Sequence, residues 1–139
     1  MSLHPSLLAE MLLEEVEVAR YELGGRVSSL EVSGTDVLCL LSGTSVGDTV
    51  IRLDGTNYDA EPLSVAVIDE SGVIAERARW PGSLFYGVHP VLGRGFACVQ
   101  GTFEYHCHPS HLNDHWDTYR ATLRLPRLLD HLVRKAGRP

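Results

Sequence analysis

Residues 26–68 decide the fold of this chain, and they read RVSSLEVSGTDVLCLLSGTSVGDTVIRLDGTNYDAEPLSVAVI. Four β-like segments lie in this stretch, near residues 26–32, 36–41, 48–53 and 63–68. Turn-forming residues separate them, at Ser33-Gly34, Ser42-Gly43 and Asp54-Gly55. Because connections this short join antiparallel neighbours, the sequence predicts a four-stranded antiparallel meander.

A helix is expected on each side of this meander. Before it, Pro5 suits a first helical turn and Gly24-Gly25 supply a stop. Apolar residues recur between them at steps of three and four, at Leu8, Met11, Leu12, Val16, Ala19 and Leu23. The glutamates on the opposite side of this helix indicate a solvated face. Near the end of the chain, Pro126 can start a second helix, whose expected core-facing residues are Leu128, Leu129, Leu132 and Val133.

Between the meander and the last helix, we expect a long loop and a hairpin. Residues 69–94 are rich in glycine and proline, so we expect a largely irregular segment, anchored by the packing of Trp80. Residues 95–100 and 102–108 flank Gly101 and are predicted to form a β-hairpin. The predicted fold class is therefore α+β: an N-terminal helix, a four-stranded antiparallel meander, a long loop with a site hairpin, and a C-terminal helix.

Composition limits the functions to consider. The 139 residues suit one domain, which we expect to span residues 1–139. A net charge of -6 disfavours binding to nucleic acid or to anionic membranes, because both need a dense positive field. The chain shows no signal-peptide pattern and no apolar run long enough for a membrane span, so a cytoplasmic protein is expected. Its three cysteines favour thiolate or metal chemistry over a disulfide framework.

The densest group of reactive side chains lies within residues 98–120. Residues 98–111 read CVQGTFEYHCHPSH. Four of the seven histidines fall in a window of ten residues, at His106, His108, His111 and His115. Alternate residues of a strand share a face, so Glu104, His106 and His108 are expected to point the same way in the predicted hairpin.

These side chains offer the atoms that a transition metal binds. Imidazole nitrogen, carboxylate oxygen and thiolate sulfur all suit Zn²⁺, and imidazole-rich sites also take other metals. Cys98 joins the ligand face if the hairpin turn has three residues or a bulge, because it then lies opposite Glu104. A two-residue turn places it opposite Tyr105, on the other face. The predicted metal ligands are Cys98, Glu104, His106 and His108.

Five further residues are candidates for a supporting role, as reserve ligands or as groups that orient the imidazoles: His111, Asp114, His115, Asp117 and Arg120. His111 and His115 are four apart and share a face if this segment is helical, although it also suits a turn. For Asp114, Asp117 and Arg120 the alternative is a surface ion pair.

The order of these elements resembles the fold of ubiquitin-conjugating enzymes. The features that carry the resemblance are the first helix, the meander ending near Tyr58-Asp-Ala-Glu-Pro62, the Trp80-Pro81 loop, His89-Pro90 and then Cys98. The four predicted ligands also resemble the Cys-Glu-His-His signature of a bacterial family that is predicted to bind metal and is associated with ubiquitin-like modification systems. The resemblance implies a bound metal, with zinc as the first candidate and another transition metal as the alternative, and a ubiquitin-like protein or pathway enzyme as partner.

Three functions follow from these observations. The first is a metal-binding domain in a bacterial ubiquitin-like modification pathway, in which a closed site would stabilise the loop and an open one would activate water. The second is a conjugating enzyme that carries a ubiquitin-like protein on Cys98 as a thioester. The His-Pro-Asn element of ubiquitin-conjugating enzymes reads His89-Pro90-Val91 here. The Asn side chain that usually stabilises the oxyanion is therefore absent, which weakens this hypothesis. The third is a non-catalytic protein-interaction domain.

Overall fold

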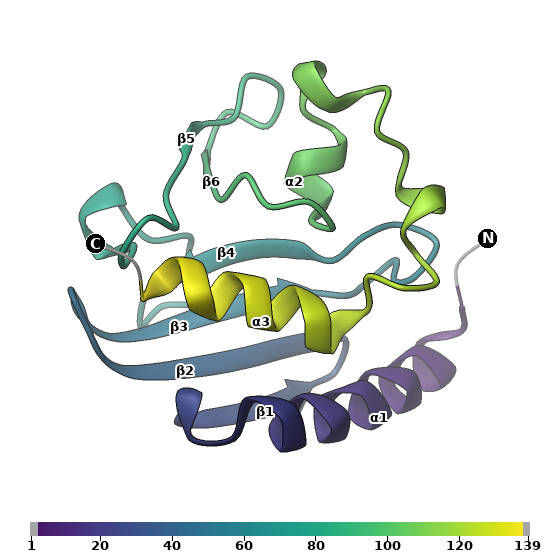
Figure 1. The fold of residues 1–139 in the computed structure, drawn as a ribbon, viewed down its shortest axis with the longest axis horizontal. Helices are drawn as coiled ribbons and strands as arrows, with labels where there is room; N and C mark the ends of the chain where they lie inside the picture. Colours follow the sequence, from purple (N-terminus) through teal and green to yellow (C-terminus); the bar gives the residue numbers. More distant parts are fainter. Residues whose placement is uncertain (1–2, 138–139) are drawn as a thin grey trace.

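The computed structural model describes residues 3–137 and has an α+β architecture (Figure 1). The chain forms α1 (Pro5–Leu23), β1 (Ser29–Ser33), β2 (Asp36–Thr44), β3 (Gly47–Asp54), β4 (Ser64–Ile68), β5 (Gly87–Val88), β6 (Gly95–Phe96), α2 (Phe103–His106) and α3 (Leu125–Ala136). Short 3₁₀ turns lie at Gly24–Arg26, Arg77–Arg79, Pro109–His111 and Trp116–Thr118.

The predicted meander is confirmed. The sheet has the order β1-β2-β3-β4, and all its neighbours are antiparallel. Cys39 in β2 pairs with Leu30 in β1 and with Ile51 in β3, and all three side chains are buried. This register gives the sheet one apolar face, which the helices cover.

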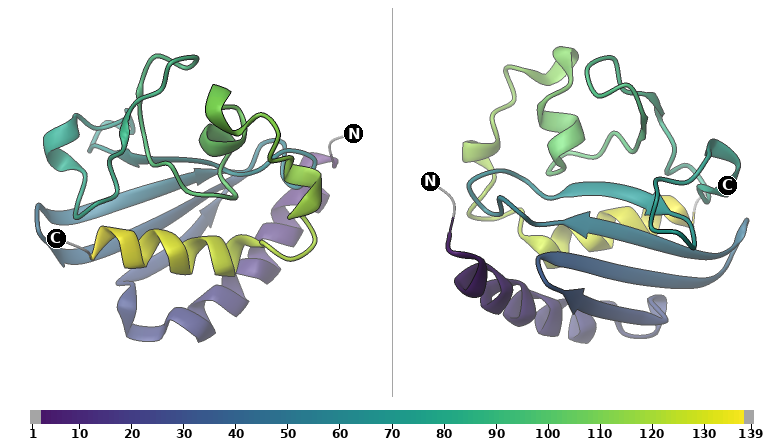
Figure 2. Two further views of the ribbon diagram at one scale, coloured as in Figure 1. Left: turned by 45° about the horizontal axis from the view of Figure 1, so that its top comes forward. Right: turned by 180° about the vertical axis from the view of Figure 1, so that it is seen from behind.

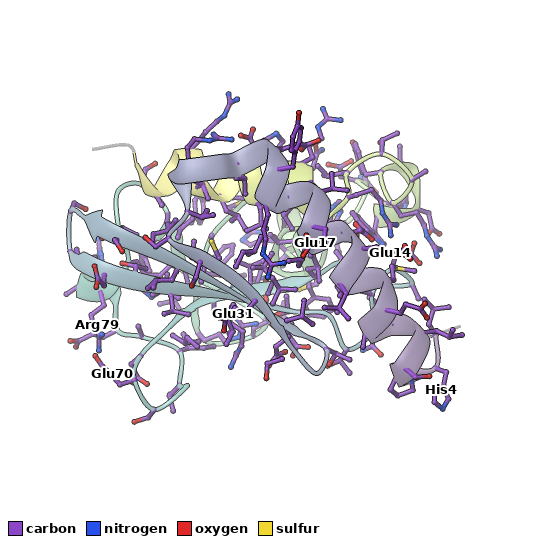
Figure 3. The ribbon with its side chains drawn as sticks, turned by 90° about the horizontal axis from the view of Figure 1, so that it is seen from below. His4, Glu14, Glu17, Glu31, Glu70 and Arg79 are labelled. Atoms are coloured by element: carbon purple, nitrogen blue, oxygen red, sulfur yellow. The ribbon has the colours of Figure 1, made fainter. Side chains whose placement is uncertain are left out.

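Both predicted long helices are present and contribute to a common core. α1 buries Leu8, Leu12, Val16, Ala19 and Leu23, the spacing expected of one helical face. Glu14 and Glu17 lie on the solvent side of the helix, as expected (Figure 3). Glu15 does not, because its side chain is only 15% exposed and pairs with Arg124 at 2.6 Å.

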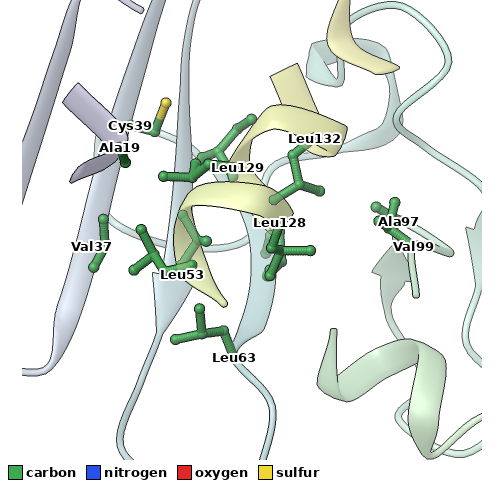
Figure 4. Packing of buried hydrophobic residues seen from close by; sticks show 14 of the residues in the cluster. Ala19, Val37, Cys39, Leu53, Leu63, Ala97, Val99, Leu128, Leu129 and Leu132 are labelled. Atoms are coloured by element: carbon green, nitrogen blue, oxygen red, sulfur yellow. The ribbon is translucent and has the colours of Figure 1, made fainter. Parts of the chain in front are cut away.

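α3 lies across the sheet, between the strands and the segment that follows β6 (Figures 1 and 4). Leu128, Leu129 and Leu132 are its buried centre, and Ala97 and Val99 belong to the same core cluster. Burying each large aliphatic side chain contributes about 1.5–3 kcal/mol, so this packing holds residues 97–99 firmly against α3.

Residues 69–94 are mostly irregular, as expected, and Trp80 anchors them. The Trp80 ring is 4% exposed, and its Nε1–H donates to the Ala75 carbonyl at 2.9 Å. Figure 2 shows from two sides that β5, β6 and α2 lie beyond the β4 edge of the sheet. Within residues 3–137, no helix is long and apolar enough to cross a membrane.

Candidate functional site

The predicted hairpin of residues 95–100 with residues 102–108 is wrong. β6 pairs with β5, and residues 103–106 form the short helix α2. Gly101 turns the chain with a φ of 100°, and the Thr102 side chain then accepts the Tyr105 backbone N–H at 3.1 Å as a helix N-cap. Because these residues are helical, the strand face expected to carry Glu104, His106 and His108 does not form.

Glu104 has a structural role and does not lie on an open face with the other predicted ligands. Its side chain is 0% exposed and reaches the edge of β4. One carboxylate oxygen accepts the Val65 N–H at 2.8 Å, and the other accepts from the Ser64 hydroxyl and from Arg94 Nη2, the latter at 2.6 Å. The carboxylate therefore ties α2 to β4.

His106 uses both ring nitrogens within the loop. Its Nε2 accepts the Gly101 backbone N–H at 3.1 Å, so the ring hydrogen is on Nδ1, which donates to the Asp114 carbonyl at 2.7 Å. An imidazole held in this way joins two turns of the chain and offers no free lone pair to a metal.

The buried His89 has a similar structural role. Its Nδ1 accepts the N–H groups of Val91 and Leu92, both at 3.1 Å, and its Nε2 donates to the Glu104 carbonyl at 2.9 Å. The His89-Pro90 element therefore shapes the loop between β5 and β6.

Cys98 lines a cavity between residues 98–100 and α3. Ala97 and Val99 point into the core and are 1% and 7% exposed, so the extended chain turns the half-buried Cys98 side chain outward. A cavity of about 310 Å³, which we call the Cys98 cavity, is lined by Cys98, Val99, Gln100, His131, Arg134 and Lys135. Burial raises the pKa of the Cys98 thiol, and the charge of Lys135 acts in the opposite direction.

His111, expected only as a reserve ligand, contacts this thiol. Its Nε2 lies 3.7 Å from Cys98 Sγ. The ring is fixed by stacking on Tyr105, with ring centroids 4.0 Å apart and an angle of 12° between the planes. The structure thus brings together a thiol and an imidazole that are separated by 13 residues in sequence.

His108 lies beside His111 but bonds locally. The two ring centroids are 5.7 Å apart. His108 Nδ1 accepts the Ser110 N–H at 3.1 Å and caps the following 3₁₀ turn. Burial lowers the pKa of His108, and the neighbouring His89 and His111 lower it further.

Asp114 holds three side chains near Cys98 by hydrogen bonds. Its carboxylate accepts from Gln100 Nε2 at 2.9 Å and from the hydroxyls of Tyr105 and Tyr119, each at 2.6 Å. The hydrogen bonds from Tyr105, Tyr119 and Gln100 lower the pKa of Asp114 to about 2. Gln100 and the two tyrosines could not be predicted from the sequence, because nothing in their spacing indicates that they share one carboxylate.

The other supporting candidates lie away from Cys98. Arg120 pairs with Asp59 at 2.9 Å and with the exposed Asp117 at 3.4 Å, so for this pair the ion-pair alternative is the correct one. His115 is exposed and lines a separate cavity of about 290 Å³, together with Asp117.

The predicted zinc ligands are not gathered at one point. Within residues 3–137, no group of three or more His, Cys, Asp or Glu side chains is arranged to hold a metal ion. Glu104 and His106 are occupied by protein hydrogen bonds, whereas Cys98 faces the Cys98 cavity. Zinc binding by Cys98, Glu104, His106 and His108 stays a prediction, without the shared strand face on which it was based.

Comparison of the sequence with protein-family models and with curated proteins finds no match. The candidate site therefore has to be interpreted from its own geometry.

Proposed function

We propose that this protein carries the C-terminal acyl group of a ubiquitin-like protein as a thioester on Cys98. The observation that carries the proposal is the position of Cys98 Sγ, which lines a cavity and lies 3.7 Å from His111 Nε2. A half-buried thiol with a neighbouring base is the arrangement that covalent acyl transfer needs.

The chemistry is an exchange of one thioester for another. The His111 imidazole takes the Cys98 proton, and the thiolate attacks the carbonyl carbon of the incoming thioester. The new carbon–sulfur bond forms, the old one breaks, and the leaving thiolate takes up the proton. Because burial raises the pKa of Cys98, the thiol form predominates at neutral pH and a base gives a real advantage.

Gln100 is the group best placed to stabilise the developing oxyanion. The element that supplies an Asn amide in conjugating enzymes reads His89-Pro90-Val91 here. Gln100 lines the Cys98 cavity, and one of its amide hydrogens is held by Asp114. We propose that the second amide hydrogen donates to the carbonyl oxygen of the group on Cys98, the role that donors of an oxyanion hole have.

The order of elements also supports this proposal. A first helix, a four-stranded meander, a His-Pro loop, a reactive cysteine and a last helix follow one another as in ubiquitin-conjugating enzymes. This is the basis for proposing a ubiquitin-conjugating-like fold and a ubiquitin-like partner.

The proposal is tested with an acetylated, lysine-free peptide thioester that ends in Gly-Gly. We expect an adduct by intact-mass spectrometry that hydroxylamine removes, as it does other thioesters. Cys98→Ser should abolish this adduct. Cys107→Ser is the matched control, because Cys107 is also half-buried but contacts His89 Nε2, at 3.5 Å, instead of His111. Equal loss in both variants, or in neither, contradicts the proposal.

Zinc binding is the second candidate function. The observation that favours it is the proximity of Cys98 and His111, with His108 beside His111, because thiolate and imidazole together suit zinc. Metal analysis of the untagged protein by mass spectrometry tests it. Stoichiometric zinc that is lost in His108→Ala with His111→Ala supports this function, whereas no zinc after reconstitution removes it.

A further inference from the structure

Lysine is nearly absent from this chain, and the one exception, Lys135, lines the same cavity as Cys98. The sequence has 12 lysine and arginine residues, of which only Lys135 is a lysine. Arginine stays protonated in proteins and does not act as a nucleophile towards an acyl group. Lys135 is therefore the only side-chain amine of the sequence that can accept one.

The fold places this amine at the Cys98 cavity. Lys135 lies in the last turn of α3, is half-buried and lines the cavity together with Cys98. Its backbone carbonyl accepts from the Ser83 N–H at 3.1 Å and from the Ser83 hydroxyl at 3.2 Å, which fixes the start of the side chain.

The charge of Lys135 is not used in an ion pair within residues 3–137. The neighbouring Arg134, by contrast, pairs with Asp130 at 3.1 Å. A half-buried amine that forms no ion pair with the described residues, and that lines the same cavity as a thiol, shares that cavity with any acyl group that the thiol carries.

We infer that Lys135 is a self-modification site, which receives the acyl group from Cys98 through the Cys98 cavity. This inference rests on the proposed function. The unprotonated Lys135 Nζ attacks the thioester carbonyl, so that a nitrogen–carbon bond forms and the sulfur–carbon bond breaks. The proton leaves the nitrogen and the Cys98 thiolate is protonated. The product is an isopeptide on Lys135 and a free Cys98 thiol, and no further reactant is needed.

The lack of other lysines gives this transfer its specificity. A protein that carries an activated acyl group is exposed to attack by its own amines, and arginine at every other basic position removes that reaction. Lys135 is then the only side chain at which the acyl group can be stored as a stable amide.

The same peptide thioester tests the inference if the adducts are then treated with hydroxylamine. Hydroxylamine cleaves a thioester on Cys98 but not an amide on Lys135. We expect the wild-type protein to accumulate a resistant adduct that peptide mapping places on Lys135. Lys135→Arg should keep the cleavable adduct on Cys98 and lose the resistant one, and Cys98→Ser should prevent acylation of Lys135.

A variant with the lysine moved tests whether position matters. Lys135→Arg combined with Arg127→Lys places the only lysine two turns earlier on α3, at an exposed residue that does not line the Cys98 cavity. This variant should form the cleavable adduct and no resistant one.

The outcomes separate this inference from the proposed function. A cleavable adduct on Cys98 without acylation of Lys135 overturns the inference and leaves the proposed function standing. Acylation of Lys135 that is equal in Cys98→Ser, or equally efficient acylation at residue 127 of the moved-lysine variant, also overturns it. No adduct of either kind overturns both.

Discussion

The buried carboxylate of Glu104 allows a sharp test of its structural role. Replacing Glu104 with Gln keeps the side-chain volume but removes the negative charge that pairs with Arg94 at 2.6 Å. Hydrogen bonds to charged groups contribute about 1.5–3 kcal/mol, and breaking a buried pair costs about 3–5 kcal/mol. Because the Arg94 side chain is 27% exposed, the pair is only partly desolvated, and we expect a loss of about 2–3 kcal/mol in the free energy of unfolding.

The assay is urea unfolding followed by tryptophan fluorescence, since Trp80 and Trp116 are both buried and report on the core. Glu70→Gln is the matched control. Glu70 also pairs with an arginine, Arg79, at 2.6 Å, but its side chain is 81% exposed (Figure 3). Solvent screens such a pair, so we expect no measurable change.

Three results would refute this reasoning. The first is a Glu104→Gln variant as stable as the wild type, and the second is a Glu70→Gln variant that loses as much stability as Glu104→Gln. The third is a difference between Glu104→Gln and the wild type that disappears when both are unfolded with a chelator present, because a metal and not Arg94 would then be the partner of Glu104.

Three further predictions concern the site. His111→Ala should slow acylation of Cys98 by about 10²-fold at neutral pH, which is the low end of the effect of a general base, and the rate should rise more steeply with pH. His131 also lines the cavity, so His131→Ala is the control and should leave the rate unchanged. Equal effects of the two substitutions would contradict the role of His111. Gln100→Ala should lower the acylation rate by about 10²-fold, as measured by single-turnover mass spectrometry, and an unchanged rate would exclude its amide as an oxyanion donor. The pKa of Asp114 is about 2 in the folded protein, below its value of about 3.9 in unfolded chains. The carboxylate therefore stabilises the folded protein above pH ~4, and this stabilisation is lost as the pH falls through about 2. Asp114→Asn should therefore lower the urea midpoint at pH 7, and the difference from wild type should shrink towards pH 2; a difference independent of pH would contradict the assignment.

The periodic parts of the fold could be predicted from the sequence, because their signals are local. The spacing of apolar residues predicts α1 and α3, and the turn pairs predict the meander. Strand bounds moved by a few residues, as in β1, which was expected near residues 26–32 and spans Ser29–Ser33. The strand starts later than expected because a 3₁₀ turn occupies Gly24–Arg26.

The site was harder to predict because its alternating pattern suits two structures. Residues 102–108 alternate like a strand, but Thr102 is an N-cap and Glu104 lies in the first turn, where an acidic side chain favours a helix. A helix of four residues is too short for periodicity to reveal it. The partners of Cys98 come from α3 and from the loop after α2, so its contact with His111 depends on tertiary packing.

The most direct test of the central claim is to map the acyl group on the wild-type protein. After exposure to the Gly-Gly peptide thioester for a time short enough to leave most molecules unmodified, protease digestion at low pH and mass spectrometry locate the first modified cysteine. We predict that it is Cys98, which lies at the cavity beside His111. First acylation at Cys107 would contradict the account.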